Sequence, residues 1–332
     1  MSQTMIYDKV QFGSESSAYG TEATSYNELS RVTAFNLTSA NGNIYSRGLG
    51  EGINAVTTTY GPFDASGNVS FAVADFSFLQ HWVGARSGAG TSGDHYKLTE
   101  ATYVAVSGAT SLVPFSIERF NEEEATDSSE FALGCVGTSF TLNGEMNSKL
   151  TCEAEFIGQK TGYRASGESY TPVTTTSFVM LNGTWKWGAT PTAISGVRSF
   201  SISYDNGLIT DTRSIESRFI NTPKLGERVY TAEVSIIMTS ALATTIINDF
   251  YGYESAGVYT PEDGSNSISP TSGLEFKIEL VNGSNYAYLQ LDECAIDEIS
   301  KPSDIGGGLS LLTFKLTSRE GKGNVPIEWW AT

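Results

Sequence analysis

The residue types that carry out most enzymatic chemistry are scarce in this sequence. It contains two histidines, His81 and His95, and three cysteines, Cys135, Cys152 and Cys294. Neither histidine has a partner at the spacing of a metal ligand, and the thiols are too scattered to hold zinc. The sequence also contains no G-x-S-x-G elbow, no H-E-x-x-H helix and no Walker loop. We therefore expect a chain that is not an enzyme and that holds no metal and no cofactor.

Three further segments have the composition of binding motifs, and each is better explained as a loop. Gly88-Ala89-Gly90-Thr91-Ser92-Gly93 matches the string G-x-G-x-x-G, but it follows an expected helix instead of a strand and opens no helix. Neither Glu122-Glu123-Glu124 nor Pro261-Glu262-Asp263-Gly264 has the alternating oxygen ligands of a calcium loop. We expect all three segments to be solvated loops.

The charge balance narrows the class of partner. The 332 residues include 20 Lys and Arg against 37 Asp and Glu, a net charge of -17. This excludes a basic surface for nucleic acid. An odd number of scattered cysteines predicts free thiols and synthesis in a reducing compartment. Because Met1–Val10 lacks the pattern of a signal peptide and no apolar run approaches the roughly 18 residues of a membrane span, we expect a soluble chain that is not exported by the Sec route.

Short runs that alternate apolar and polar residues recur along the chain and set the fold class. They are Arg31–Ser39, Asn68–Ala74, Ser139–Leu142, Leu150–Ile157, Ser199–Tyr204 and Val229–Ile237. Alternation with a period of two predicts strands with one buried and one wet face. Helical spacing occurs in Phe76–Val83 and Ser240–Tyr251. The sequence therefore predicts a mainly β protein with short flanking helices.

The wet faces of these strands are small, hydroxylated or acidic. In one strand Ser199, Ser201 and Ser203 share a face, and in another Glu153 and Glu155 do so. Such a face repels phosphates and offers them no ammonium or guanidinium, so nucleic acid beside it would slide. A solvated outer face of a sheet explains the same pattern, and the pattern alone leaves both interpretations open.

The two halves of the chain repeat each other. At an offset of 165 residues six pairs coincide without a gap: Val32/Val197, Phe35/Phe200, Leu37/Ile202, Asn41/Asn206, Gly42/Gly207 and Ile44/Ile209. At offsets near 160, Gly134–Thr141 aligns with Glu293–Ser300, and Leu150–Gly158 aligns with Ser310–Ser318. The common order predicts two similar units. Chance alignment of two β-rich, Asn-Gly-containing segments is the alternative.

Each half opens with a strand that ends in Asn-Gly, a dipeptide that favours a tight turn, so we expect both strands to reverse there. Long excursions follow in Asn43–Gly67 and Leu208–Gly226, and each leads to a strand and then a helix.

Three segments resemble the tail tube (major tail) proteins of long-tailed phages and related viruses. Phe12–Thr21 resembles their Gly-x-Glu-Ser-x-x-Tyr-Gly-Thr start, Gly134–Gly158 their central hairpin, and Val197–Asn206 the strand that opens their later half. The resemblance implies β-sandwich or barrel units that assemble into rings, and rings that stack into a hollow virion tail tube through which the genome leaves.

From the resemblance and the repeat together we expect two tandem tail-tube-type units. The boundaries are an N-terminal arm (1–30), a first unit (31–165), a connector (166–195), a second unit (196–323) and a C-terminal tail (324–332). A ring that needs six such units would then hold three chains, a homotrimer with pseudo-sixfold symmetry. One fold per chain and six chains per ring is the alternative. A decorating element within Lys160–Thr192 is also left open.

The resemblance also implies roles for particular residues. We expect the lumen to be lined by Asn36, Thr38, Thr151, Glu153, Glu155, Ser201, Ser203, Thr231, Glu233 and Ser235. We expect ring stacking to use the charged residues of the excursions, namely Arg47, Glu51, Asp64, Asp211, Arg213, Glu216, Arg218, Lys224, Glu227 and Arg228.

The implied partners are other copies of the chain together with tape-measure, tail-tip and tail-terminator proteins. Viral DNA would pass through the lumen without specific binding, and no membrane is involved. The implied location is the virion tail after synthesis in the host cytoplasm. A carbohydrate-binding or adhesive β-sandwich is the alternative function, with Trp185-Lys186-Trp187 or Trp329-Trp330 stacking on sugar rings.

Overall fold

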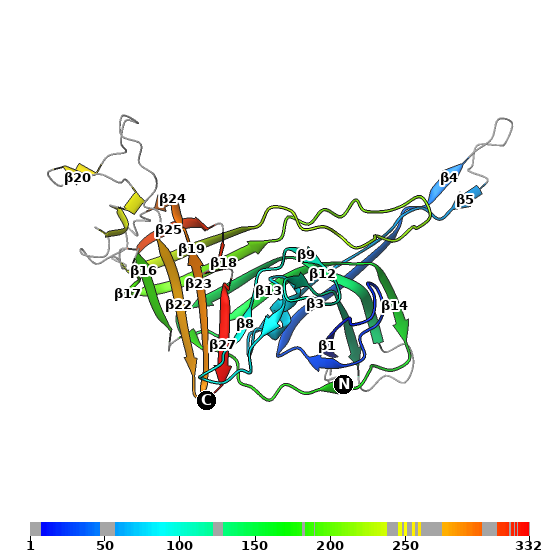
Figure 1. Cartoon of the computed structure of the whole chain (residues 1–332), viewed down its shortest axis with the longest axis horizontal. Coiled ribbons are helices and arrows are strands. Elements are labelled where there is room, and N and C mark those ends of the chain that lie inside the picture. Colours follow the sequence, from blue (N-terminus) through cyan, green and yellow to red (C-terminus); the bar gives the residue numbers. More distant parts are fainter. Residues whose placement is uncertain are drawn as a thin grey trace, which may run out of the picture.

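The computed structural model shows a molecule built almost entirely from strands (Figure 1). It describes residues 8–46, 57–121, 129–180, 183–188, 190–237, 245–247, 249–250, 254–255, 258–259, 274–300, 311–318, 320–321, 323 and 325–331. Among these residues, no helix is long and apolar enough to cross a membrane.

One long antiparallel ladder of eight strands runs through the molecule. Its order is β3 (Val32–Asn41), β6 (Phe63–Ala72), β13 (Thr151–Gly158), β12 (Ser129–Glu145), β18 (Val197–Asp205), β19 (Val229–Ile237), β25 (Leu311–Ser318) and β24 (Ala295–Ser300). We call the first four strands the first quartet and the last four the second quartet. The β12–β18 pair joins them.

Two further groups of strands cover this ladder, one for each quartet. The first group has the order β15 (Tyr170–Thr171), β2 (Tyr26–Glu28), β1 (Asp8–Ser14), β11 (Phe115–Asn121), the beginning of β12, and β14 (Lys160–Arg164). The second has the order β17 (Thr192–Ile194), β16 (Thr184–Gly188), β22 (Glu275–Asn282), β23 (Asn285–Asp292), β27 (Ile327–Ala331), β8 (Tyr96–Leu98) and β7 (Arg86–Ser87), with β26 (Glu320–Gly321) also on β23.

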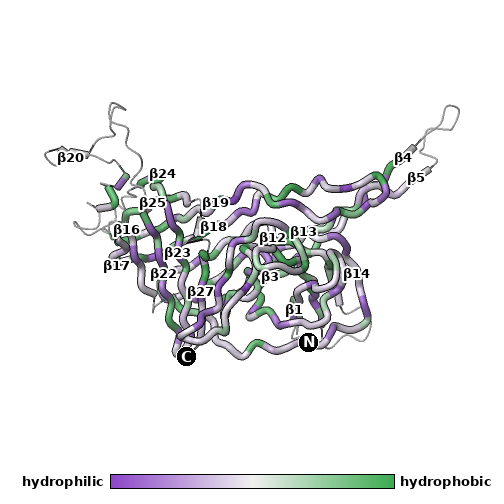
Figure 2. The backbone as a smooth tube through the Cα atoms, viewed as in Figure 1, coloured by the Kyte–Doolittle hydropathy of each residue, from purple (hydrophilic) through white to green (hydrophobic). Residues whose placement is uncertain are grey.

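The core lies between the ladder and its two covers, because successive side chains of a strand point to opposite faces. Hydrophilic and hydrophobic residues alternate along strands such as β22 and β23 (Figure 2). The 3-10 helix η1 (Ser77–His81) leads into Trp82, which is fully buried. The indole Nε1 of Trp82 donates a 2.8 Å hydrogen bond to the carbonyl oxygen of Glu155, which ties the helix to β13.

The strand and fold-class predictions are confirmed. All six predicted runs overlap strands, and Val229–Ile237 has the predicted bounds. Of the two predicted helices, the first contains η1, and residues 245–247 and 249–250 are helical in the second.

The predicted reversal at Asn-Gly is wrong in both halves. The amide of Gly42 donates to the carbonyl oxygen of Pro62 at 2.7 Å, so the pairing of β3 with β6 continues past Asn41 toward β4 (Ile44–Ser46) and β5 (Thr57–Thr59). Figure 1 shows this extension, which contains β4 and β5, as a long projection. We call its described residues, 42–46 and 57–62, the arm; it is distinct from the predicted N-terminal segment 1–30. After Gly207 the chain continues as a loop, in which the backbone amides and carbonyl oxygens of Ile209 and Lys224 bond each other. Long-range pairing therefore overrides the turn preference.

The quartets share more than their strand order. The β18–β19 register is the β3–β6 register displaced by 165 residues, and the bulge after Val32 recurs after Val197. The bulge between Gly137 and Ser139, where β12 pairs with β13, recurs between Ile296 and Glu298, where β24 pairs with β25. Equivalent residues of β12 and β24 differ by 159 in number. Bulges interrupt a ladder at defined places, so their recurrence is a specific correspondence.

Candidate functional site

Polar side chains form rows across one face of the long ladder, opposite the core. The register places Asn36, Asn68, Glu155 and Ser139 in one row, Glu153, Thr141, Ser203, Thr231 and Thr317 in a second, and Asn143, Ser201, Glu233, Lys315 and Glu298 in a third. All ten residues predicted to line a lumen lie on this face. We call it the polar face.

Hydrogen bonds between neighbouring strands hold the polar face together. Thr141 and Ser203 join their hydroxyl oxygens at 2.9 Å across the β12–β18 joint. Ser139 donates to the Glu155 carboxylate at 3.1 Å, and a similar hydroxyl pair joins β19 to β25. Because each cross-strand pair stabilises a sheet by a few tenths of a kcal/mol or more, these polar side chains contribute to the stability of the sheet.

The polar face is acidic, with one cation in its rows. Glu153, Glu155 and Glu233 are all exposed. Lys315 lies 3.0 Å from the carboxylate of Glu298 and 3.9 Å from that of Glu233. The hydrogen bond to Glu298 raises the pKa of the Lys315 ammonium. The strand that carries Lys315 was predicted only through the repeat. Because Lys315 is already paired with carboxylates, the described rows of this face offer phosphate no unpaired cation.

The joint between the quartets is completed by a buried asparagine. Residues 139–145 of β12 pair with residues 199–205 of β18. Asn206, directly after β18, has 0% exposed surface, and its side-chain amide donates to the carbonyl oxygens of Trp82 and Gly137, both at 2.8 Å. The end of β18 is therefore fixed to both the helix and β12.

The two outer strands of the ladder have no such joint. Among the residues that the structure describes, β3 pairs only with β6, and β24 pairs only with β25. An edge strand with unpaired N–H and C=O groups is a template for pairing with another chain.

The arm and the loop 208–228 lie together at one end of the molecule (Figure 1). Arg213 forms an ion pair with Asp64 at the base of the arm, and Arg218 donates to the side chain of Asn41. Three of the predicted stacking residues are thus paired inside the chain. Exposed apolar side chains gather on the same elements, namely Ile44, Tyr45, Tyr60, Ile209 and Ile215.

The other predicted stacking residues divide into two groups. Asp211, Glu216, Lys224, Glu227 and Arg228 lie on the loop 208–228, whereas Arg47 and Glu51 lie outside the described residues. The stacking role of all ten residues stays a prediction.

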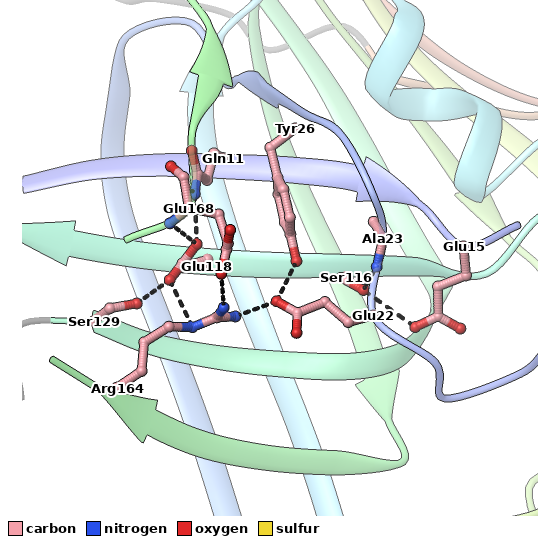
Figure 3. A network of polar contacts seen from close by, with 10 residues as sticks. All are labelled: Gln11, Glu15, Glu22, Ala23, Tyr26, Ser116, Glu118, Ser129, Arg164 and Glu168. Carbon is pink, nitrogen blue, oxygen red and sulfur yellow. Dashed lines mark hydrogen bonds and ion pairs between the residues drawn. The ribbon is translucent and has the colours of Figure 1, made fainter. Parts of the chain in front are cut away.

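A buried carboxylate network in the first cover was not predicted (Figure 3). Glu118 has 0% exposed surface. Its carboxylate lies 3.1 Å from the Arg164 guanidinium Nε and accepts hydrogen bonds from Gln11, Ser129 and the amide of Glu168. An acidic residue within an alternating run is expected to face solvent, so the local sequence pattern does not predict this buried network.

A second buried carboxylate, Glu15, lies in the turn after β1. It accepts hydrogen bonds from the amides of Gly134 and Gly20 at 2.7 and 2.8 Å. Burial nevertheless dominates and raises its pKa to about 7. Glu15 thereby ties the N-terminal turn to the bend of β12 at Gly134.

The histidines and cysteines of the chain have structural surroundings. His81 is buried and bonds the carbonyl oxygen of Val113 at 2.7 Å through Nδ1, and burial lowers its pKa to about 4. His95 stacks on Trp330 with ring centroids 3.8 Å apart. Burial raises the pKa of the three thiols. Within the described ranges no group of three ligating residues could hold a metal ion.

The aromatic residues of the carbohydrate-binding alternative are buried. Trp185, Trp187, Trp329 and Trp330 all belong to the core, so they present no platform for a sugar ring.

Comparison with known proteins agrees with the tube resemblance. The family model described as "Phage tail tube protein" matches residues 9–325. No curated protein matches the chain significantly.

Proposed function

The chain belongs to the phage tail tube protein family, and from that premise we propose that its two quartets are two tube units and that three chains close into one ring. The protein is a structural component of the virion tail, and its family suggests self-assembly into a tube.

The observation that carries the trimeric ring is the β12–β18 joint. β18 corresponds to β3, and β12 corresponds to β24. If two copies meet as β12 and β18 meet within the chain, β24 of one copy therefore pairs with β3 of the next. Three such steps use both edges of every chain and leave six units in a closed ring.

The joint also predicts the register of the contact between copies. Because Thr141 lies opposite Ser203 in the joint, Ser300 of one copy should lie opposite Thr38 of the next. The units keep the same facing around the ring, so the polar face of every chain lines the lumen. This anionic, hydroxyl-rich wall lets DNA pass without specific binding, because it repels phosphate at ranges of about 8 Å in physiological salt.

Stacking of rings is assigned to the arm and the loop 208–228. They carry exposed apolar side chains, and surfaces of that kind mark contact sites. Head-to-tail stacking does not close, so other tail proteins must set the tube length. Release of the genome through the tube, and the tape-measure, tip and terminator partners, belong to this proposal.

The proposal predicts a specific cross-link. The variant Thr38→Cys with Ser300→Cys should, on mild oxidation, give disulfide-linked dimers and trimers on a non-reducing gel, since the paired Cβ atoms of opposite strand residues lie within about 5.5 Å. Top views of the same sample by electron microscopy should show six lobes around a hole. Each ring should have the mass of three 35.6 kDa chains.

Two controls frame this experiment. Thr141→Cys with Ser203→Cys places the same pair in the internal joint and should close within one chain. Thr38→Cys with Glu298→Cys is two residues out of register and should not cross-link. A protein that stays monomeric, or rings of six chains, would overturn the trimeric ring.

A further inference from the structure

A hairpin of the first half extends the cover of the second half. β8 pairs with β27, with Leu98 opposite Ile327 and Lys97 opposite Glu328. β7 pairs with the outer side of β8. As a result Ile327 is 3% exposed. The first unit therefore donates a hairpin to the unit that follows it along the ladder.

The counterpart of β27 in the first half is β14, and its outer edge is open. β14 pairs with β12 so that Tyr163 lies opposite Glu130, and Ile327 lies opposite Leu289 on β23. Glu130 and Leu289 are equivalent at the offset of 159, so Tyr163 corresponds to Ile327. Tyr163 is 69% exposed where Ile327 is covered, and among the described residues β14 pairs only with β12.

The counterpart of the β7–β8 hairpin in the second half is β20 (Glu254–Ser255) with β21 (Val258–Tyr259). Arg86 pairs with Leu98 in the first hairpin, and Glu254 pairs with Tyr259 in the second. Each hairpin follows a helix of its own half. Within the described part of the chain, however, β20 and β21 form a two-stranded sheet that pairs with no third strand.

The open edge and the free hairpin cannot meet within one chain, because β20 and β14 lie at opposite ends of the molecule (Figure 1). We propose that β21 of one copy pairs antiparallel with β14 of the next copy, with Tyr259 opposite Tyr163 and Val258 opposite Arg164. The proposal rests on the proposed ring and adds a second contact between the same two copies, in the cover layer outside the lumen.

The β14 edge is held ready for such a partner. Arg164 is pinned by ion pairs with Glu118, Glu22 and Glu168 (Figure 3), and its guanidinium lies 4.4 Å from the ring centroid of Phe131. The hydroxyl of Tyr163 donates to Glu130 at 3.0 Å. A strand fixed on its inner side keeps its outer backbone groups aligned, which favours addition of a strand from another chain.

The test is a cross-link in assembled rings. Tyr163→Cys with Tyr259→Cys should give disulfide-linked dimers and trimers after mild oxidation. The control variant, Lys97→Cys with Glu328→Cys, lies in the equivalent contact within one chain, one residue along from the Leu98–Ile327 pair that matches Tyr259 and Tyr163. It should close without any increase in oligomer mass. Tyr163→Cys with Ser255→Cys is out of register and should not cross-link.

Amide hydrogen exchange gives a second readout that needs no substitution. Exchange of residues 160–164 should slow by about tenfold or more when rings form, because their outer amides become paired. Rings that form the Thr38–Ser300 cross-link but neither the Tyr163–Tyr259 cross-link nor this protection would overturn the strand addition and leave the ring intact. Failure of all cross-links between copies, without rings, would overturn both.

Discussion

Asn206 and Asn41 occupy the same place in the two halves, and only one of them is covered. Asn206 is buried in the joint, where its amide bonds two carbonyl oxygens and accepts a hydrogen bond from the Tyr204 hydroxyl at 2.7 Å. Asn41 is exposed at the open edge and receives a bond from Arg218. In the proposed ring, Asn206 lies in the joint that is formed within the chain, and Asn41 lies at the edge where the equivalent joint to another copy would form.

The largest expected effect comes from removing the buried member of this pair. Asn206→Ala deletes three hydrogen bonds, two of them to buried carbonyl oxygens, so it should destabilise the fold by about 4 kcal/mol. Asn41→Ala should lower the free energy of unfolding of the monomer by less than about 1 kcal/mol. Urea unfolding followed by circular dichroism measures both.

Asn41→Ala should instead weaken ring assembly, which sedimentation at several protein concentrations detects. Equal losses of monomer stability in the two variants would contradict the equivalence of joint and edge.

Strands and repeats could be predicted from the sequence because they leave local or periodic patterns in it. Features that depend on contacts between distant residues leave no such pattern and could not be predicted. Alternation in Val229–Ile237 gave a strand with the observed bounds because its two faces differ in burial. The repeat offsets also appear in the strand registers, since equivalent residues pair equivalently. The arm after Asn41 was missed because a distant strand captures the chain there, and the Glu118 network because burial of a charge depends on residues far along the chain.

The bend of β12 at Gly134 has a counterpart between β23 and β24 at Glu293. Gly134 has a φ of 63° and Glu293 a φ of 51°, so both halves turn the chain from cover to ladder through the left-handed region. Among the described residues a buried carboxylate contacts the first bend and not the second, because Glu15 accepts a hydrogen bond from the Gly134 amide. The same backbone geometry is thus stabilised by different chemistry in the two halves.

The buried carboxylate should make stability depend on pH. Burial raises the pKa of Glu15 from 4.5 to about 7, so between these values the folded state binds more protons than the unfolded state. Stability is therefore greatest below about pH 4.5 for this group and falls as pH rises to about 7, by about 3 kcal/mol in all. Glu15→Gln should flatten this slope in denaturant titrations from pH 5 to 7. An unchanged slope would show that another group carries it.

The smallest expected effect tests whether the bend itself is required. A non-glycine residue in the left-handed region costs about 1 kcal/mol, so Glu293→Gly should stabilise the fold by up to about that amount. Gly134→Ala should destabilise it, since the added Cβ would lie 2.7 Å from the Cβ of Gln159 and φ would stay positive. Thermal unfolding of the two variants measures both changes in stability. Opposite signs would show that both halves demand the same backbone conformation and that, of these two bends, the first has the residue suited to it. A loss of stability in Glu293→Gly would mean that the Glu293 side chain, and not the bend, stabilises the second half.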